Sequence, residues 1–408
     1  MPIDPERATV ALADTKWFGH HPTYFREFVA SLRRLGAFVI ALCPQPAELE
    51  PREGVWPGKL TSPNHSLILS SRDNDPASTF TRWWRVRQAL DAAEDRCGRR
   101  ADLVFFPYLD NFLRLLPAPI VPDLVLGRPW SGLYFRNQHL GQPLNGAASR
   151  LRALAKGDVL LRGKCALPLL GVLDERFNGV LLERSGREAI QFPDITDETA
   201  PSSPSPLAIT LLERAAGRPI IGLAGSLEKR KGLLTLLRAA EASARAGDAL
   251  FYAAAGPFAA ETFTAEEMAF IEETRERLAA SLYLDIPGAR IPDGAPYNSI
   301  FQAFSIAWAA YENFQGSSNT LTKAALFAKP VLASEGECIG QRVREYRLGA
   351  AFPESDAAAA RAAIHQVLRE EAAGNAARRY EDYRHFHSRP QLDAVFRRLL
   401  ESLPSRPA

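Results

Sequence analysis

Short apolar runs alternate with helical patterns through the first half of the chain. An apolar run at residues 9–14 is followed by side chains that recur at helical spacing, namely Phe25, Phe28, Val29 and Leu32. Glycine commonly follows a helix C-terminus, so Gly36 is expected to end this helix. Three further runs of strand type come next, at 38–43, 102–110 and 132–136. Strands and helices that alternate in this way predict a doubly wound parallel sheet.

A second series of the same kind occupies the other half. The segment between the two series, 193–207, is rich in Pro, Ser and Thr and predicts a linker with a hinge near residue 200. Strands are expected at 219–225, 249–256, 305–311 and 330–334, and helices at 232–246 and 264–280. The pattern therefore predicts two α/β domains in tandem, 1–200 and 201–385.

The end of the chain carries an apolar stripe on one predicted helix. Its members recur at helical spacing: Leu392, Val395, Phe396, Leu399 and Leu400. A stripe this regular marks an amphipathic helix that buries one face. Residues 386–408 are therefore expected to dock on one of the domains.

Length and composition fit this division. At 408 residues the chain is too long for one compact core and suits two domains of about 200 residues. The net charge of +2 argues against bulk nucleic-acid binding. The four cysteines form no CxxC pair, which argues against structural zinc and disulfides and favours a reducing cytoplasm. Neither a signal peptide nor a membrane-spanning segment is expected.

Three loops follow predicted strands and precede predicted helices. The first contains Gly19, His20 and His21 and lacks the GxGxxG pattern of dinucleotide binding. Glycine at such a position lets a ligand approach the backbone closely. The alternative is an ordinary loop with two exposed histidines.

The second loop contains a run of charged residues after the strand that ends at Gly225. Three adjacent cations, Lys229, Arg230 and Lys231, are costly to cluster without a counter-charge. A phosphate or pyrophosphate would supply that charge. The alternative is a solvated charge run, and the GxxxxGK[ST] pattern of a P-loop is absent.

The third loop reads GSSNT, from Gly316 to Thr320. Ser, Asn and Thr are preferred helix N-caps, and the free N–H groups of a helix N-terminus attract anions. This loop and the loop of Lys231 follow strands of the same predicted sheet, so we expect both to face one ligand at its carboxyl edge. The alternative is an ordinary capped helix.

These stretches together carry a resemblance. The segments 18–36, 225–241, 253–258 and 311–349 are similar to the family 4 (group 1) retaining glycosyltransferases of GT-B fold. The similarity covers both domains and is strongest over 219–350. It implies a GT-B fold whose last helix crosses back to the N-terminal domain. It also implies metal-independent transfer of a sugar, with retention, from a nucleotide-sugar donor held mainly by the C-terminal domain.

The resemblance assigns roles to residues that match the family's motifs. Lys231 matches the basic residue that neutralises the donor diphosphate, and Gly19 matches a nearby glycine of the N-terminal domain. Arg230 takes the place of an arginine that the family carries at the position of Ser226. The implied donor-binding set is Gly19, His20, Gly225, Ser226, Gly256, Gly316, Ser317, Ser318, Asn319, Thr320 and Lys323.

The chain departs from the family at two further places. The family's Glu-x7-Glu pair aligns with Gln315 and Lys323, and the nearest acid is Glu312. The family's N-terminal-domain histidine falls near Arg136, with His139 three residues on. By resemblance, Arg136 and His139 are therefore catalytic candidates beside Lys231 and Arg230. Without a placed carboxylate nucleophile, the family's front-side attack is the implied route to retention.

The partners implied by the resemblance are a UDP- or GDP-linked hexose donor and a saccharide, lipid-linked or small-molecule acceptor, as in polysaccharide biosynthesis. One alternative is a catalytically silent GT-B-fold protein that binds a nucleotide sugar or another partner. Another is a nucleotide-sugar 2-epimerase, for which a paired acid set would be expected.

A predicted helix at 80–87 combines aromatic and basic residues. Phe80, Trp83 and Trp84 are expected on one helical face with arginines close by. This composition favours either peripheral contact with the anionic inner face of a membrane or burial of both tryptophans in the core.

Overall fold

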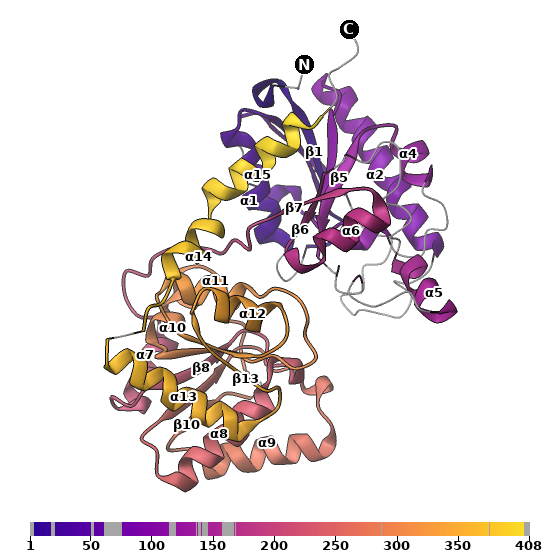
Figure 1. The fold of residues 1–408 in the computed structure, drawn as a ribbon. Helices are drawn as coiled ribbons and strands as arrows, with labels where there is room; N and C mark the ends of the chain where they lie inside the picture. The colour runs from indigo at the N-terminus through magenta and orange to yellow at the C-terminus, as the bar shows by residue number, and fades with distance from the viewer. Residues whose placement is uncertain are drawn as a thin grey trace. The chain divides into compact units, whose positions relative to one another are not determined.

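The computed structural model describes residues 4–17, 21–49, 53–60, 76–113, 120–135, 137, 140, 146–156, 167, 169–286, 288–374 and 376–403. The chain divides into two compact units, unit 1 (Met1–Pro193 and Ser388–Ala408) and unit 2 (Asp194–His387) (Figure 1). Each unit contains one parallel β-sheet with helices packed on it. The predicted α/β class with two tandem sheets is therefore confirmed.

Unit 1 contains a seven-stranded sheet of order β3-β2-β1-β4-β5-β6-β7. Its strands are β1 (Thr9–Ala13), β2 (Phe38–Cys43), β3 (Val55–Lys59), β4 (Leu103–Phe106), β5 (Trp130–Tyr134), β6 (Leu169–Val172) and β7 (Glu188–Gln191). Its helices are α1 (His21–Arg34), α2 (Pro76–Cys97), α3 (Asp110–Leu113), α4 (Ile120–Leu126), α5 (Ala147–Lys156), α6 (Asn178–Ser185) and α15 (Arg389–Glu401).

The central strands of unit 1 are apolar on both faces because helices cover both faces of the sheet. All five residues of β1 are buried, and β1 pairs with β2 on one side and β4 on the other. The strand expected at 102–110 is shorter than predicted and ends at Phe106. Strand β3, which contains Pro57, lies at the edge of the sheet, where a missing backbone donor is tolerated.

Helix α15 packs on α1, beside which it runs in Figure 1. Asp393 accepts hydrogen bonds from Ser31 Oγ at 2.5 Å and Arg34 Nη2 at 2.7 Å. The fully buried ring of Phe396 lies 5.2 Å from the Phe28 ring, centroid to centroid. The prediction that the last helix returns to the N-terminal domain is confirmed.

Unit 2 contains a six-stranded sheet of order β10-β9-β8-β11-β12-β13. Its strands are β8 (Ile220–Ala224), β9 (Phe251–Ala255), β10 (Leu282–Leu284), β11 (Ile306–Ala309), β12 (Val331–Ser334) and β13 (Gly349–Phe352). Its helices are α7 (Pro206–Ala215), α8 (Leu233–Ala246), α9 (Ala265–Arg277), α10 (Ala295–Ala303), α11 (Asn319–Leu326), α12 (Cys338–Glu345), α13 (Ala357–Ala372) and α14 (Tyr380–Phe386).

Two apolar clusters fill unit 2. One contains residues of α8, α9 and α13, and the other contains residues of α7, α10, α11, α12 and α14. Because the strands contribute side chains to both clusters, the sheet lies between them. No helix among the described residues is long and apolar enough to cross a membrane.

The segment predicted as a linker, 193–207, belongs to unit 2 except for Pro193. Asp194, Ile195 and Thr196 are buried, so this part of the segment is packed although its composition is that of a linker. The backbone N–H of Asp194 donates to Nδ1 of His387 at 2.8 Å. The first and last residues of unit 2 are therefore joined by one hydrogen bond.

Candidate functional site

The carboxyl edge of the unit 2 sheet has a switch point between β8 and β11. From β8 the chain passes to β9 and β10 on one side, and it then returns to β11 on the other side. The loops that follow β8 and β11 therefore flank the crevice where open parallel sheets usually bind ligands. These two loops contain most of the predicted donor-binding residues.

Glycines allow close packing of the backbone at this edge. Gly256 has φ +133°, and a Cβ there would lie 2.2 Å from the carbonyl oxygen of Gly225. Gly232 has φ +74°, and a Cβ there would lie 2.1 Å from the carbonyl oxygen of Ala310. A side chain at either position would force neighbouring loops apart. The strand ends are thus kept close to one another without side chains between them.

The charge run after β8 is more neutralised than its sequence indicates. Lys229 pairs with Glu267 at 2.5 Å, and Arg230 pairs with Glu228 at 2.6 Å. The assumption of three cations without counter-charge is therefore wrong for these two residues. Lys231 differs from both, because it forms no ion pair with a carboxylate in the described part of the chain.

The Lys231 ammonium is held by the hydroxyl of Tyr311, the second residue after β11. Lys231 Nζ donates to Tyr311 Oη at 2.7 Å, Ser318 Oγ donates to it at 3.1 Å, and Thr320 Oγ1 lies 2.9 Å from it. Burial raises the pKa of Tyr311, but the charge of Lys231 and the hydrogen bonds of Lys231, Ser318 and Thr320 outweigh burial and hold this pKa below its ordinary value. The network joins the β8 loop to the start of α11.

Ser318 is the N-cap of α11, as its sequence predicts. Its Oγ accepts from the backbone N–H of Thr320 at 3.3 Å. The preceding Gly316 and Ser317 are half-buried. Helix N-termini favour anions, so the GSSNT loop places a favourable dipole next to the Lys231–Tyr311 pair.

Other residues of the GSSNT loop bind the segment after the unit boundary. Ser317 Oγ donates to Asp194 at 2.5 Å, and Asn319 Nδ2 donates to the carbonyl of Ile195 at 2.6 Å. Thr196 Oγ1 donates to Asn319 Oδ1 at 3.0 Å. These side chains stabilise the start of unit 2, whereas the backbone of their loop remains at the sheet edge.

Lys323 is also occupied within unit 2. Its Nζ donates to Asn298 Oδ1 at 2.6 Å and to the carbonyl of Asp197 at 2.8 Å. Burial lowers the pKa of Lys323 to about 8, against the opposing effect of Asp197, Asp293 and Glu198. The structure therefore gives Lys323 a role in holding the 197–199 region against α10 and α11.

Carboxylates near this edge have partners of their own. The buried Glu312 accepts a hydrogen bond from Thr235 Oγ1 at 2.6 Å, and its backbone N–H donates to the carbonyl of Arg230 at 2.8 Å. Gln315, the residue aligned with the first acid of the family pair, lies 3.5 Å from Glu337. Glu312 thus connects the β8 loop, through its backbone, to α8, through its side chain.

Four predicted site residues lie outside the described residues. They are Gly19, His20, Arg136 and His139. The remaining predicted residues all belong to unit 2. Five of them follow β8 or β9 at the carboxyl edge of the sheet: Gly225, Ser226, Arg230, Lys231 and Gly256.

Unit 1 has its own switch point, between β1 and β4. Asp14 follows β1, and its buried carboxylate lies 2.7 Å from Nδ1 of His21, the first residue of α1. The His21 ring stacks on Tyr108, which follows β4, at a centroid distance of 3.6 Å. Sequence reasoning noted His21 but not Asp14, because their pairing is visible only when the β1–α1 loop is folded.

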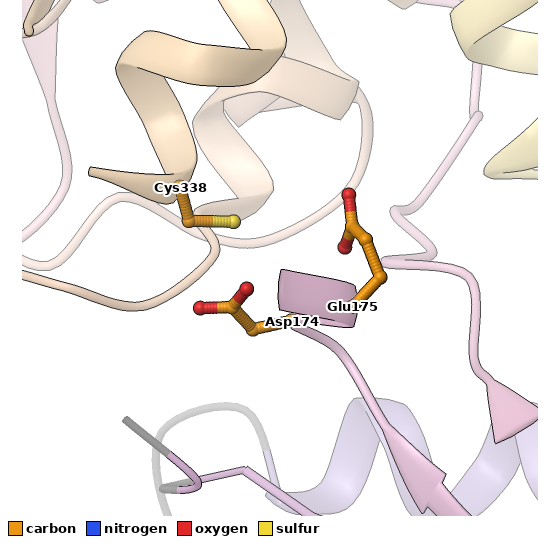
Figure 2. Close-up of side chains that lie close together, drawn as sticks. All are labelled: Asp174, Glu175 and Cys338. Carbon is orange, nitrogen blue, oxygen red and sulfur yellow. The ribbon is translucent and has the colours of Figure 1, made fainter. Parts of the chain in front are cut away.

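Figure 2 shows three further side chains whose oxygen and sulfur atoms are of the kinds that bind metal ions, Asp174, Glu175 and Cys338. Asp174 and Glu175 follow β6 in unit 1, and Cys338 begins α12 in unit 2. Within unit 1, the Asp174 carboxylate is bound by Arg176 at 2.8 Å. Asp174 is thus neutralised inside its own unit, as expected for a carboxylate with a structural role.

The aromatic-basic helix is part of α2. Trp83 is buried, and its Nε1 donates to the carbonyl of Phe112 at 2.8 Å. Phe80 and Trp84 are 47% and 49% exposed. The expectation that all three aromatic residues share one face is wrong for Trp83, because it belongs to the core and the other two face outward.

Tyr311 is the main site residue that sequence reasoning did not assign. It ends an apolar run, IAWAAY, and such a position reads as core. The sequence does place Tyr311 directly after a predicted strand and shortly before the GSSNT loop. This position could have indicated a site residue, because polar groups at the carboxyl ends of parallel strands meet at one edge of the sheet.

No family model and no curated protein matches the chain. Its fold is similar to solved structures of low identity. Sucrose-phosphate synthase from Thermosynechococcus elongatus is 17% identical with a TM-score of 0.66, covering 96% of this chain and 99% of that one. Anabaena HepE in complex with UDP and glucose is 14% identical with a TM-score of 0.64, covering 97% and 100%.

A third similar structure, of a trehalose-6-phosphate protein from E. coli, is bound with UDP-2-fluoro glucose. It is 12% identical with a TM-score of 0.67, and the match covers 98% of this chain and 100% of that one. These likenesses extend over nearly the whole of each chain. The chain therefore has the two-sheet GT-B fold that its sequence predicts.

Proposed function

We propose that the chain transfers a hexose from a UDP- or GDP-linked donor to a saccharide, lipid-linked or small-molecule acceptor. The observation that carries this proposal is Lys231, a half-buried cation at the unit 2 switch point whose ammonium is held by a phenol. A diphosphate would supply its counter-charge. Two proteins of similar fold support a nucleotide-sugar donor, since HepE is in complex with UDP and glucose and the E. coli protein is bound with UDP-2-fluoro glucose.

Stabilisation of the leaving group is the largest requirement of the proposed reaction. When a nucleoside diphosphate departs from an anomeric carbon, negative charge develops on its phosphate. Lys231 and the positive end of the α11 dipole would stabilise that charge, and loss of one such contact typically costs about 2–4 kcal/mol of barrier. Arg230 contributes a second positive charge to the same loop, although Glu228 offsets part of it.

Retention, which the family resemblance implies, suits this arrangement. In front-side attack the acceptor oxygen bonds to the anomeric carbon on the face from which the phosphate oxygen departs, so retention requires no carboxylate nucleophile. The acceptor proton passes to the departing phosphate, which takes the place of a separate base. Glu312, the acid nearest to the aligned positions, is engaged by Thr235. The anomeric configuration of the product, measured by proton NMR during turnover, tests this part of the proposal, and an inverted product would contradict it.

The first experiment is a thermal-shift screen with UDP-, GDP- and ADP-sugars, because it identifies the donor base. The second compares two lysine variants of one loop, each assayed with the donor selected by the screen. Lys231→Ala should lower turnover by about 30- to 1,000-fold, which is the rate equivalent of 2–4 kcal/mol. Lys229→Ala is the matched control, because Lys229 is paired with Glu267, and it should change turnover by less than about threefold.

Two results would change the proposal. Equal activity of folded Lys231→Ala and wild type would remove Lys231 from the site. Tight binding of a nucleotide sugar without hydrolysis or transfer, over a broad acceptor panel, would favour the alternative of a silent binding protein. The observation that favours this alternative is that Gln315 and Lys323 stand where the family has its two acids.

We also propose that the protein works in the cytoplasm and rests on the inner face of a membrane through α2. The exposed rings of Phe80 and Trp84, one helical turn apart, support this contact. Exposed aromatic residues on one helix face are suited to the headgroup region of a bilayer.

A further inference from the structure

The hydroxyl of Tyr311 joins the two loops of the proposed donor site. Tyr311 is 3% exposed, and its Oη is within hydrogen-bond distance of Lys231, Ser318 and Thr320. Lys231 ends the β8 loop, and the other two residues belong to the N-terminus of α11. One oxygen atom thus connects the cation to the helix end that would share its ligand.

The donors and acceptors of this network are matched. A phenol oxygen can accept two hydrogen bonds and donate one. Lys231 Nζ and Ser318 Oγ donate to it, so the phenol proton is directed to Thr320 Oγ1 at 2.9 Å. Because every hydrogen-bonding capacity of Oη is used, the direction of the Lys231 side chain is determined. An ammonium has three N–H groups, and only one is needed for Tyr311.

A phenol suits this position better than a carboxylate. A carboxylate would neutralise Lys231 and weaken its attraction for a second anion. The adjacent carboxylate of Glu312 does not neutralise Lys231, since it accepts a hydrogen bond from Thr235 on α8. A neutral Tyr311 therefore orients the ammonium and leaves its charge for a ligand.

We propose that Tyr311 is the positioning residue that holds Lys231 for the diphosphate of the donor. The inference rests on the proposed function, because it specifies how that site presents its cation. Tyr311 acts through Lys231 and need not touch the nucleotide base. Its removal should therefore weaken ligands that carry phosphate and spare ligands that lack it.

The same contact makes anion binding sensitive to alkaline pH. The charged groups that act on Tyr311 are Lys231 from the β8 loop and, when ionised, Tyr297 from α10, whose own pKa is raised by burial. As pH rises, a phenolate at Tyr311 would pair with Lys231 and oppose the diphosphate. The advantage of wild type over a Tyr311→Phe variant should therefore shrink as pH rises.

The test is calorimetric titration of the full chain with UDP and with uridine, or with GDP and guanosine if the donor screen selects guanine. At pH 7, Tyr311→Phe should bind the diphosphate about tenfold more weakly than wild type, the loss expected for one hydrogen bond to a charged group. Nucleoside affinity should stay within twofold. The control Tyr252→Phe removes another buried phenol of unit 2, bonded to Ser243 at 2.8 Å, and should change neither affinity.

The pH arm repeats the diphosphate titration in steps from pH 7.0 up to the ordinary tyrosine pKa of 10.0, because the pKa of Tyr311 lies below that value. Ionisation of the ligand affects both proteins alike, so the ratio of their affinities reports on Tyr311. A ratio that falls towards one supports the proposal, and a constant tenfold ratio would overturn the pH consequence. Thr320→Val, which removes the acceptor of the phenol proton and leaves the Lys231–Tyr311 bond in place, should produce a smaller loss with the same preference for phosphate.

The possible outcomes separate the two proposals. If wild type binds neither UDP nor GDP, the proposed function fails. If wild type binds and Tyr311→Phe binds the diphosphate equally well, the positioning role fails alone. Equal losses for diphosphate and nucleoside would show a general structural role and would also overturn it. Should Tyr311→Phe not fold, the Thr320→Val variant decides by the same comparison.

Discussion

Removal of the Phe396 ring should destabilise unit 1 through its last helix. The ring is fully buried and lies 5.2–5.4 Å, centroid to centroid, from those of Phe28, Phe105 and Phe192. These partners come from α1, from β4 and from the residue after β7. The Phe396→Ala variant therefore loses contacts with three parts of the unit at once.

The expected cost is about 4 kcal/mol. Replacement of a buried Phe by Ala typically costs about 3–5 kcal/mol, and the loss of aromatic pairs places this site in the upper half of that range. Domains are stable by only about 5–15 kcal/mol. With a urea m-value of about 2 kcal/mol/M, the unfolding midpoint of unit 1 should fall by about 2 M.

Tryptophan fluorescence is the appropriate assay. Trp308 is the one tryptophan of unit 2, and the other five belong to unit 1. The control is Phe80→Ala, the same substitution at a 47% exposed position of unit 1, which should shift stability by less than about 0.5 kcal/mol. A loss below about 1 kcal/mol for Phe396→Ala would refute the conclusion that α15 is an integral part of unit 1.

Two further predictions concern unit 1. His21→Gln should lower the rate of sugar transfer by at least tenfold, because Asp14 orients the His21 ring at the unit 1 switch point. The affinity of unit 2 for UDP should stay within twofold. An unchanged transfer rate would mean that the Asp14–His21 pair has a purely structural role. The double variant Phe80→Ser/Trp84→Ser should pellet less with anionic vesicles than wild type does. Equal, negligible pelleting of both would argue against membrane contact.

Much of the fold follows from local patterns. Strands such as β1 and β2 are continuous apolar runs because helices cover both sheet faces, and the stripe on α15 indicates burial on one side. Edge strand β3 has the sequence VWPGK, which has neither pattern, because an edge strand needs fewer apolar contacts and tolerates proline.

The site was less predictable because its contacts join distant parts of the chain. The sequence indicates that Lys229, Arg230 and Lys231 are adjacent, but the pairing of Lys229 with Glu267 depends on how α9 packs. Composition likewise suggested a linker at 193–207. Its first residues are buried because Ser317 and Asn319 bind them, and no local pattern reveals such a pairing.

The hydrogen bond between Asp194 and His387 has a consequence for how the gene can be altered. Unit 2 is an uninterrupted stretch of chain, and its two ends meet at this bond. In terms of chain topology, unit 2 lies between the two segments of unit 1, the second of which is the last 21 residues, Ser388–Ala408. A segment with adjoining ends can be exchanged as a cassette. A chimaera cut after Pro193 and before Ser388 could therefore receive the corresponding segment of a similar chain in place of unit 2.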